Sequence, residues 1–216
     1  MNVEILLIIT AVLGTIAFSV SGALIAIENK LDLFGVIMLG CITACGGGLI
    51  RDVMIGKELA IFKTPWYLLI SAITNAIVFI IMYFLKKTSW ENSKIYKVFF
   101  NITDSIGLGT FVVTGANVAL SSGIDSMLPV CFYGVLTACG GGLIRDLMVM
   151  KIPAIFRKHI YAVASIIGAV IFYTMNYFEI LYVVNVLTTV VLVVIIRYLA
   201  FYFEWSLPKV TLTENQ

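Results

Sequence analysis

Residues 43–52 read Thr43-Ala44-Cys45-Gly46-Gly47-Gly48-Leu49-Ile50-Arg51-Asp52, and the same ten residues recur as Thr137-Ala138-Cys139-Gly140-Gly141-Gly142-Leu143-Ile144-Arg145-Asp146. An exact copy of this length, 94 positions further along the chain, indicates an internal duplication. Each copy places three consecutive glycines, which cost a helix roughly 1 kcal/mol each relative to Ala, between an apolar run and an Arg-Asp pair. We therefore take the two copies as the structural centre of the chain.

The duplication extends on both sides of the glycines. Matches before them lie at an offset of 93 and include Phe18 with Phe111 and Gly22 with Gly115; those after them lie at 94 and include Tyr67 with Tyr161. The repeated unit holds three apolar runs. After three crossings the chain would begin its second unit on the opposite side of a membrane, so the two units are expected to be inverted relative to each other.

The composition places the chain among membrane proteins, with a lipid bilayer as its surroundings. Of its 216 residues 61% are hydrophobic and 12% are charged, and the mean hydropathy is +1.07. The 14 Lys and Arg residues are scattered and the net charge is only +2, which argues against a nucleic-acid partner. The four cysteines lie in apolar runs without metal-binding spacing, so we expect packing residues and no metal site or cofactor.

Seven apolar runs are long enough to cross a bilayer. They are Ile5–Ile27, Leu33–Ile50, Trp66–Leu85, Val98–Ile124, Ser126–Ile144, Ile160–Phe178 and Ile180–Ile196. The sequence thus predicts an all-α membrane protein. Its expected parts are a first three-helix repeat (1–85), a polar linker (86–97), a second, inverted repeat (98–178), a seventh helix (179–199) and a tail (200–216). The last apolar run is the shortest, and it can still span the membrane if the Arg197 side chain reaches the membrane surface.

The distribution of basic residues predicts the orientation. Three Lys and Arg residues fall at the N-terminus and in the connections after the second, fourth and sixth runs, whereas eleven fall in the other connections and the tail. Because basic residues accumulate on the cytoplasmic side, we expect the N-terminus outside, with the linker and the tail in the cytoplasm. The expected location is the inner or plasma membrane of the cell.

The glycine triplets allow two interpretations. In lipid, irregular backbone is tolerated only where protein or a water-filled cavity covers it, so kinks at Gly46–Gly48 and Gly140–Gly142 would line a permeation path. Alternatively, the glycines merely allow close packing of helices. We favour the kinks, because three adjacent glycines present different helix faces, which a packing stripe does not require.

Charged residues at membrane depth normally pair inside the bundle. Adjacent helical residues do not face each other, so the symmetric pairing of Arg51 with Asp146 and of Arg145 with Asp52 is expected. Asp104, an acid inside the fourth run, is the rival partner. A third interpretation places both Arg-Asp pairs at helix ends in the headgroup region. The polar residues expected to line the path, in addition to these charges, are Ser19, Ser21, Thr43, Thr114, Asn117 and Thr137.

The doubled GGGLIRD motif in a chain with seven apolar runs resembles the TRIC (trimeric intracellular cation) channels, in particular their prokaryotic branch, which shares its sequence family with proteins described as glycine transporters. The resemblance covers about residues 6–199. It implies a homotrimer with one pore per protomer, lined by the first, second, fourth and fifth helices, of which the second and fifth are kinked at the glycines. The lysine-bearing motif by which animal members bind phosphoinositides is missing here, so calcium-store and phosphoinositide roles do not transfer.

The expected function is that of a homotrimeric channel for monovalent cations, chiefly K⁺, with Na⁺ as the other candidate ion. The alternative is a secondary transporter for a small zwitterion such as glycine, because Arg and helix N-termini would bind its carboxylate while carbonyls and Asp would bind its ammonium group. An enzyme is not expected, since no Walker lysine, zinc spacing or nucleophile elbow is present.

Overall fold

The computed structural model describes residues 3–85, 93–157 and 160–205. The regular elements in these ranges are all helices, and seven of them are long and apolar enough to span a membrane. The long helices are α1 (Val3–Glu28), α2 (Leu33–Ile55), α4 (Trp66–Leu85), α5 (Lys94–Leu120), α6 (Met127–Met148), α8 (Ile160–Tyr177) and α9 (Tyr182–Tyr202). The predicted all-helical fold with seven membrane spans is confirmed; residues 86–92 of the expected linker and 206–216 of the tail lie outside the described ranges.

Three spans end several residues later than the sequence predicts. The predicted second, fifth and seventh runs stop at Ile50, Ile144 and Ile196, whereas α2 continues to Ile55, α6 to Met148 and α9 to Tyr202. A count of uncharged residues stops at the first charge, but the helices accommodate the two Arg-Asp pairs and Arg197 because these side chains form hydrogen bonds within the protein. α2 and α6 are each followed, after a short connection, by a four-residue helix that the sequence did not predict, α3 (Ala60–Lys63) and α7 (Ala154–Arg157).

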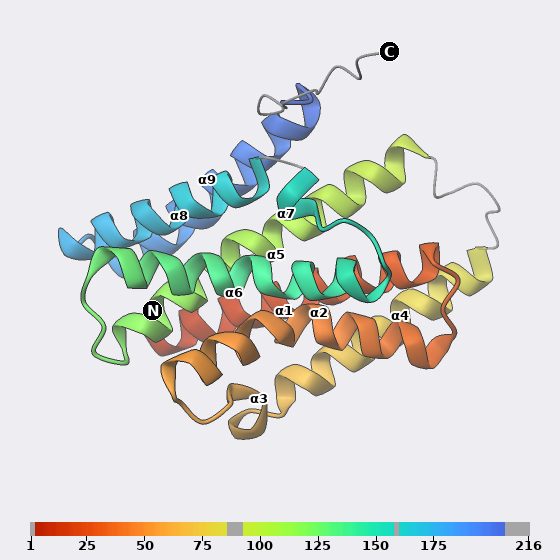
Figure 1. Ribbon diagram of the computed structural model, residues 1–216, viewed down its shortest axis with the longest axis horizontal. Coiled ribbons are helices and arrows are strands. Elements are labelled where there is room, and N and C mark those ends of the chain that lie inside the picture. The colour runs from red at the N-terminus through yellow and green to blue at the C-terminus, as the bar shows by residue number, and fades with distance from the viewer. Residues whose placement is uncertain (1–2, 86–92, 158–159, 206–216) are drawn as a thin grey trace, which may run out of the picture.

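Four helices form the centre of the molecule. α1, α2, α6 and α5 pack against one another in a closed ring of contacts. α4 packs on α1 and α2, whereas α8 packs on α5 and α6, and α9 covers α5 and α8 (Figure 1). The two repeats therefore bury their first two helices against each other and keep their third helix at the periphery.

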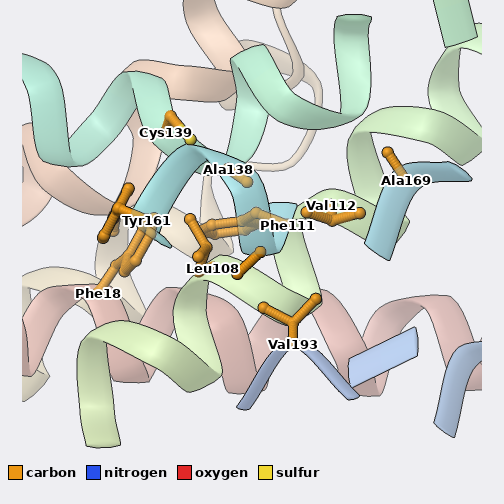
Figure 2. Packing of buried hydrophobic residues seen from close by; sticks show 11 residues of the cluster. Phe18, Leu108, Phe111, Val112, Ala138, Cys139, Tyr161, Ala169 and Val193 are labelled. Atoms are coloured by element: carbon orange, nitrogen blue, oxygen red, sulfur yellow. The ribbon is translucent and has the colours of Figure 1, made fainter. Parts of the chain in front are cut away.

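Equivalent residues of the two repeats meet at the middle of this ring. Phe18 of α1 and Phe111 of α5 have ring centroids 5.1 Å apart. Around them lies a cluster of buried apolar side chains that includes Leu108 and Val112 (Figure 2). Contact between residues at matching positions of two repeats is expected at a pseudo-two-fold axis, so this cluster marks where that axis passes.

The glycine triplets lie where α2 crosses α6. A methyl group added at Gly47 would lie 2.0 Å from the carbonyl oxygen of Thr137, and one at Gly141 would lie 2.0 Å from that of Thr43. Both triplets are helical throughout, so neither helix is unwound there. The close-packing interpretation therefore applies to Gly47 and Gly141, while the bend at each triplet stays a prediction.

Candidate functional site

A buried network of charges is built around Arg145, which is 1% exposed. Its Nη1 donates to Oδ1 of Asp104 (2.8 Å) and to Oγ of Ser21 (2.5 Å). Its Nε donates to Oδ1 of Asp146 (2.9 Å), and the Ser21 hydroxyl in turn donates to Asp104 (3.1 Å). The network joins α1, α5 and α6. It gives the buried guanidinium group charged and polar partners, without which its burial would cost several kcal/mol of free energy.

A second arginine, on the seventh span, belongs to the same network. Nη2 of Arg197 donates to Oδ1 of Asn101 (3.0 Å) and lies 3.9 Å from Oδ2 of Asp104, and its guanidinium group lies 4.7 Å from the ring centroid of Tyr161. The seventh span was expected to be long enough if Arg197 reached the membrane surface; the Arg197 side chain is instead buried in this network and only 3% exposed. With Asp146, the network holds two arginines and two carboxylates, so it is electrically balanced.

In the first repeat, Arg51 pairs with the residue that follows it. Its Nε and Nη2 both donate to Oδ1 of Asp52, at 2.8 and 2.6 Å. Oδ2 of Asp52 accepts from the backbone N–H of Ala60 (2.8 Å) and so joins the end of α2 to the start of α3. The corresponding bond in the second repeat, from Ala154 N–H to Asp146 Oδ2, has the same length.

These contacts correct the expected pairing. The predicted ion pairs between repeats, Arg51 with Asp146 and Arg145 with Asp52, are not formed; each arginine instead bonds the next residue, and Arg145 also bonds the rival partner, Asp104. The rule that neighbouring helical side chains diverge fails here because an arginine side chain is long enough to curl back. The headgroup interpretation is right that the pairs lie near helix ends, but all four side chains are buried.

A cavity of about 90 Å³ lies beside the first glycine triplet. Its wall comes from α1, α2, α5 and α6, the four helices that the resemblance implied for a pore, together with α3 and α4. Four residues predicted to line the path do contribute to this wall: Gly48, Arg51, Thr114 and Thr137. The other lining residues are Ala11, Thr15, Ala44, Cys45, Leu49, Ala60, Ile61, Tyr67 and Phe111.

The remaining predicted polar residues do not line this cavity. The Ser19 hydroxyl bonds the Ser71 hydroxyl between α1 and α4 (2.7 Å). The Thr43 hydroxyl bonds the Leu39 carbonyl of its own helix (2.6 Å). Asn117 accepts from the Tyr182 hydroxyl between α5 and α9 (3.2 Å). Ser19 and Asn117 therefore connect neighbouring helices, and Thr43 bonds a carbonyl of its own helix. Ser21 belongs to the Arg145 network.

Three residues at the two sites were not predicted as site residues. Arg197 was expected at the membrane surface, and Tyr67 and Tyr161 were noted only as a matching pair of the duplication. Tyr161 is buried beside Arg197, and Tyr67 lines the cavity. The signal that could have found the tyrosines is this matching position in the duplication.

Comparison with known proteins assigns the family. The profile of the glycine transporter family matches residues 8–83 and 101–177, one segment in each proposed repeat. The chain belongs to this family. It is also 33% identical over 206 residues to the UPF0126 inner membrane protein YadS of Escherichia coli K12, a match that covers 94% of this chain and 96% of YadS.

Solved structures of the same fold are those of TRIC channels. The TRIC trimeric intracellular cation channel orthologue from Rhodobacter sphaeroides is 28% identical, with a TM-score of 0.83 over 93% of this chain and 99% of that one. A prokaryotic TRIC channel crystallised in 0.5 M KCl is 32% identical, with a TM-score of 0.84 over 94% and 100%. The resemblance to the prokaryotic TRIC family is thus confirmed. These structures are of ion channels and not of enzymes, as expected, and the chain is an integral membrane protein.

Proposed function

We propose that this protein is a homotrimeric channel for monovalent cations, chiefly K⁺, in the inner or plasma membrane of the cell. Each protomer would conduct through its own centre, with the N-terminus outside and the C-terminus in the cytoplasm. The observation that carries the proposal is the cavity beside Gly48, whose wall includes residues of α1, α2, α5 and α6. Similarity to structures described as trimeric cation channels supports both the ion class and the assembly.

The chemistry of the cavity wall suits a cation. The Thr114 hydroxyl donates its proton to the Thr110 carbonyl (2.9 Å), and the Thr137 hydroxyl donates to the Tyr133 carbonyl (2.6 Å). A hydroxyl group that donates its proton in this way still has a free lone pair, so both oxygens can accept a hydrogen bond or coordinate a cation. A partly dehydrated monovalent cation binds such neutral oxygens, while Asp52 offsets the charge of Arg51.

Conduction of ions across the whole protein also requires a conformational change in the second repeat. The cavity occupies the first-repeat side of the four-helix centre, and the Arg145 network fills the corresponding place on the other side with buried, hydrogen-bonded side chains. A continuous path for ions therefore needs Arg145 and Asp104 to separate or swing aside. We place the gate of the channel at this network.

The function is tested by recording from purified protein in planar bilayers. Under a KCl gradient we expect unitary currents that reverse near the potassium equilibrium potential. Bilayers that receive a protein preparation without the channel provide the control. Absence of currents from folded protein that has entered the bilayer would overturn the proposal.

Transport of a small zwitterion such as glycine is the second candidate. Arg51 on the cavity wall favours it, because a fixed guanidinium group is a natural partner for a carboxylate. The test is uptake of labelled glycine into vesicles. Saturable uptake that carries no current would support the transporter and contradict the channel.

Filling the cavity is expected to reduce conduction. Thr114→Leu removes one oxygen and adds apolar bulk to the wall, so we expect the unitary K⁺ current to fall severalfold or disappear. Thr103→Leu is the matched control, because Thr103 lies on the same helix and does not line the cavity. Its current should equal that of the wild type, and equal currents in both variants would show that ions do not pass this cavity.

A further inference from the structure

The end of α6 and the connection that follows it are held to α1 at two places, one buried and one at the surface. At the buried contact, Arg145 donates to the hydroxyl group of Ser21. At the surface contact, Nζ of Lys151 lies 2.7 Å from Oε1 of Glu28, the last residue of α1. The side chains of Lys151 and Glu28 are 38% and 30% exposed. Solvent therefore reaches the second contact but not the first.

Glu28 has a further partner on α5. The hydroxyl group of Tyr96 donates to Oε2 of Glu28 (3.0 Å) and lies 3.3 Å from the carbonyl oxygen of Leu24. The helix dipole disfavours a carboxylate at the C-terminal end of a helix, and both partners of Glu28 offset that cost. Glu28, Tyr96 and Lys151, which we call the latch, thus join α1, α5 and the connection after α6.

Aromatic rings on α5 connect the latch to the buried charge network. The rings of Tyr96 and Phe100 are stacked, with centroids 6.4 Å apart and an interplanar angle of 20°. The guanidinium group of Arg145 lies over the Phe100 ring, 5.3 Å from its centroid. Tyr96, Phe100 and Asp104 follow one another at intervals of four residues, so they share one face of α5. The latch and the network are therefore the two ends of one row of contacts.

The duplication does not generate this row a second time. At the offset of 93, the matching positions hold no acid and no aromatic residue: they are Ser121 for Glu28, Val3 for Tyr96 and Leu7 for Phe100. The row is therefore a feature of one side of the four-helix centre. This is the side on which the Arg145 network closes the path, and not the side of the cavity.

We infer that Glu28 is a positioning residue for the gate: the latch and the rings of α5 hold Arg145 against Asp104. The inference rests on the proposed channel function, in which these two side chains must separate before ions pass. They separate most directly when the end of α6 moves away from α1 and α5, the parts that the latch joins to it. Loss of the latch removes contacts of the closed arrangement and so favours the open one.

Single-channel recording in planar bilayers tests the inference through charge changes at the latch. In Glu28→Gln and in Lys151→Met, the open probability should rise about two- to fivefold, the range for a partly exposed ion pair. Reversal of both charges, in Glu28→Lys with Lys151→Glu, should return the open probability toward that of the wild type. The unitary current should be unchanged in every variant, because no latch residue lines the cavity.

A double-mutant cycle tests whether the aromatic rings carry the effect. Phe100→Leu removes the ring that contacts both the Tyr96 ring and the guanidinium group of Arg145. In this background, Glu28→Gln should change the open probability much less than it does in the wild type. The reason is that the latch has then lost its contact with the network. Equal effects in the two backgrounds would contradict the inference.

A second readout does not depend on conduction. Hydrogen–deuterium exchange of the purified protein in detergent reports how often the backbone at the end of α6 opens. In Glu28→Gln, exchange over residues 139–151 should be faster than in the wild type by about two- to fivefold. If the wild-type protein carries no current, the proposed channel fails, and this exchange alone decides whether the latch holds α6.

Glu58→Gln is the matched control. Glu58 forms an ion pair with Lys63 (3.1 Å) at the surface of the first repeat, so its loss should change neither the open probability nor the exchange at the end of α6. Three results would overturn the inference. They are an unchanged open probability in both single latch variants, a charge reversal that does not restore it in folded protein, or exchange in Glu28→Gln that equals that of the wild type.

Discussion

Asp104→Ala is expected to cost about 3–5 kcal/mol of stability, the usual penalty for removing one partner of a buried ion pair. Asp104 is 1% exposed and lies between the guanidinium groups of Arg145 and Arg197. Without it, two buried cations would share only Asp146. For a chain of this size, such a loss corresponds to a fall in the thermal midpoint of roughly 10 °C, which can be measured on detergent-solubilised protein.

Removing the second arginine should cost less stability in this variant than in the wild-type protein. In Asp104→Ala with Arg197→Met, Arg145 and Asp146 remain as one balanced pair, so the double variant should be less destabilised than the two single changes added together. Asp125→Ala, which changes an exposed Asp in the same repeat, should leave the midpoint unchanged. Additive losses in the double variant would show that Asp104 and Arg197 do not act on each other.

Gly47→Ala and Gly141→Ala are expected to be the most damaging small substitutions in the chain. Each added methyl group would lie 2.0 Å from a backbone carbonyl oxygen of the opposite helix. Backbone cannot turn away as a side chain can, so α2 and α6 would have to separate. We expect a cost of about 3 kcal/mol or more for each change, at or above the upper end of ordinary overpacking.

Gly48→Ala is the matched control within the same triplet. Its methyl group would meet only Nη2 of Arg51, at 3.6 Å, an ordinary contact, and alanine favours a helix by roughly 1 kcal/mol over glycine. The thermal midpoint should therefore rise slightly or stay the same. A similar loss for Gly47→Ala and Gly48→Ala would contradict the close crossing of α2 and α6.

Much of the fold is predictable from the sequence because its determinants are repeated and local. The apolar runs give the number of spans, and the doubled stretch around Gly47 and Gly141 gives the relation between the halves. The ends of α2 and α6 were missed because hydropathy alone does not show that a charge such as Arg51 has a partner. That information depends on how the side chain folds back, which the sequence pattern does not contain.

The candidate site was predictable only in part. Charged residues such as Arg145 and Asp104 are rare in apolar runs and normally pair with each other, and their contact was one of the pairings considered. The burial of Arg197 was not foreseen, because it depends on Asp104 and Asn101 of another helix. A path beside the glycines was predicted, but the exact place of the cavity was not, because it depends on how side chains of six helices pack together.

The central claim is that ions pass through the cavity between α1, α2, α5 and α6. The most direct measurement is the K⁺ current of a Thr114→Cys protein, in a background where the four native cysteines are replaced by serine, before and after addition of a small cationic thiol reagent. The account predicts that modification at position 114 blocks the current irreversibly, whereas Thr103→Cys in the same background keeps its current. A current that persists unchanged after complete modification of Thr114→Cys, verified by mass spectrometry, would contradict it.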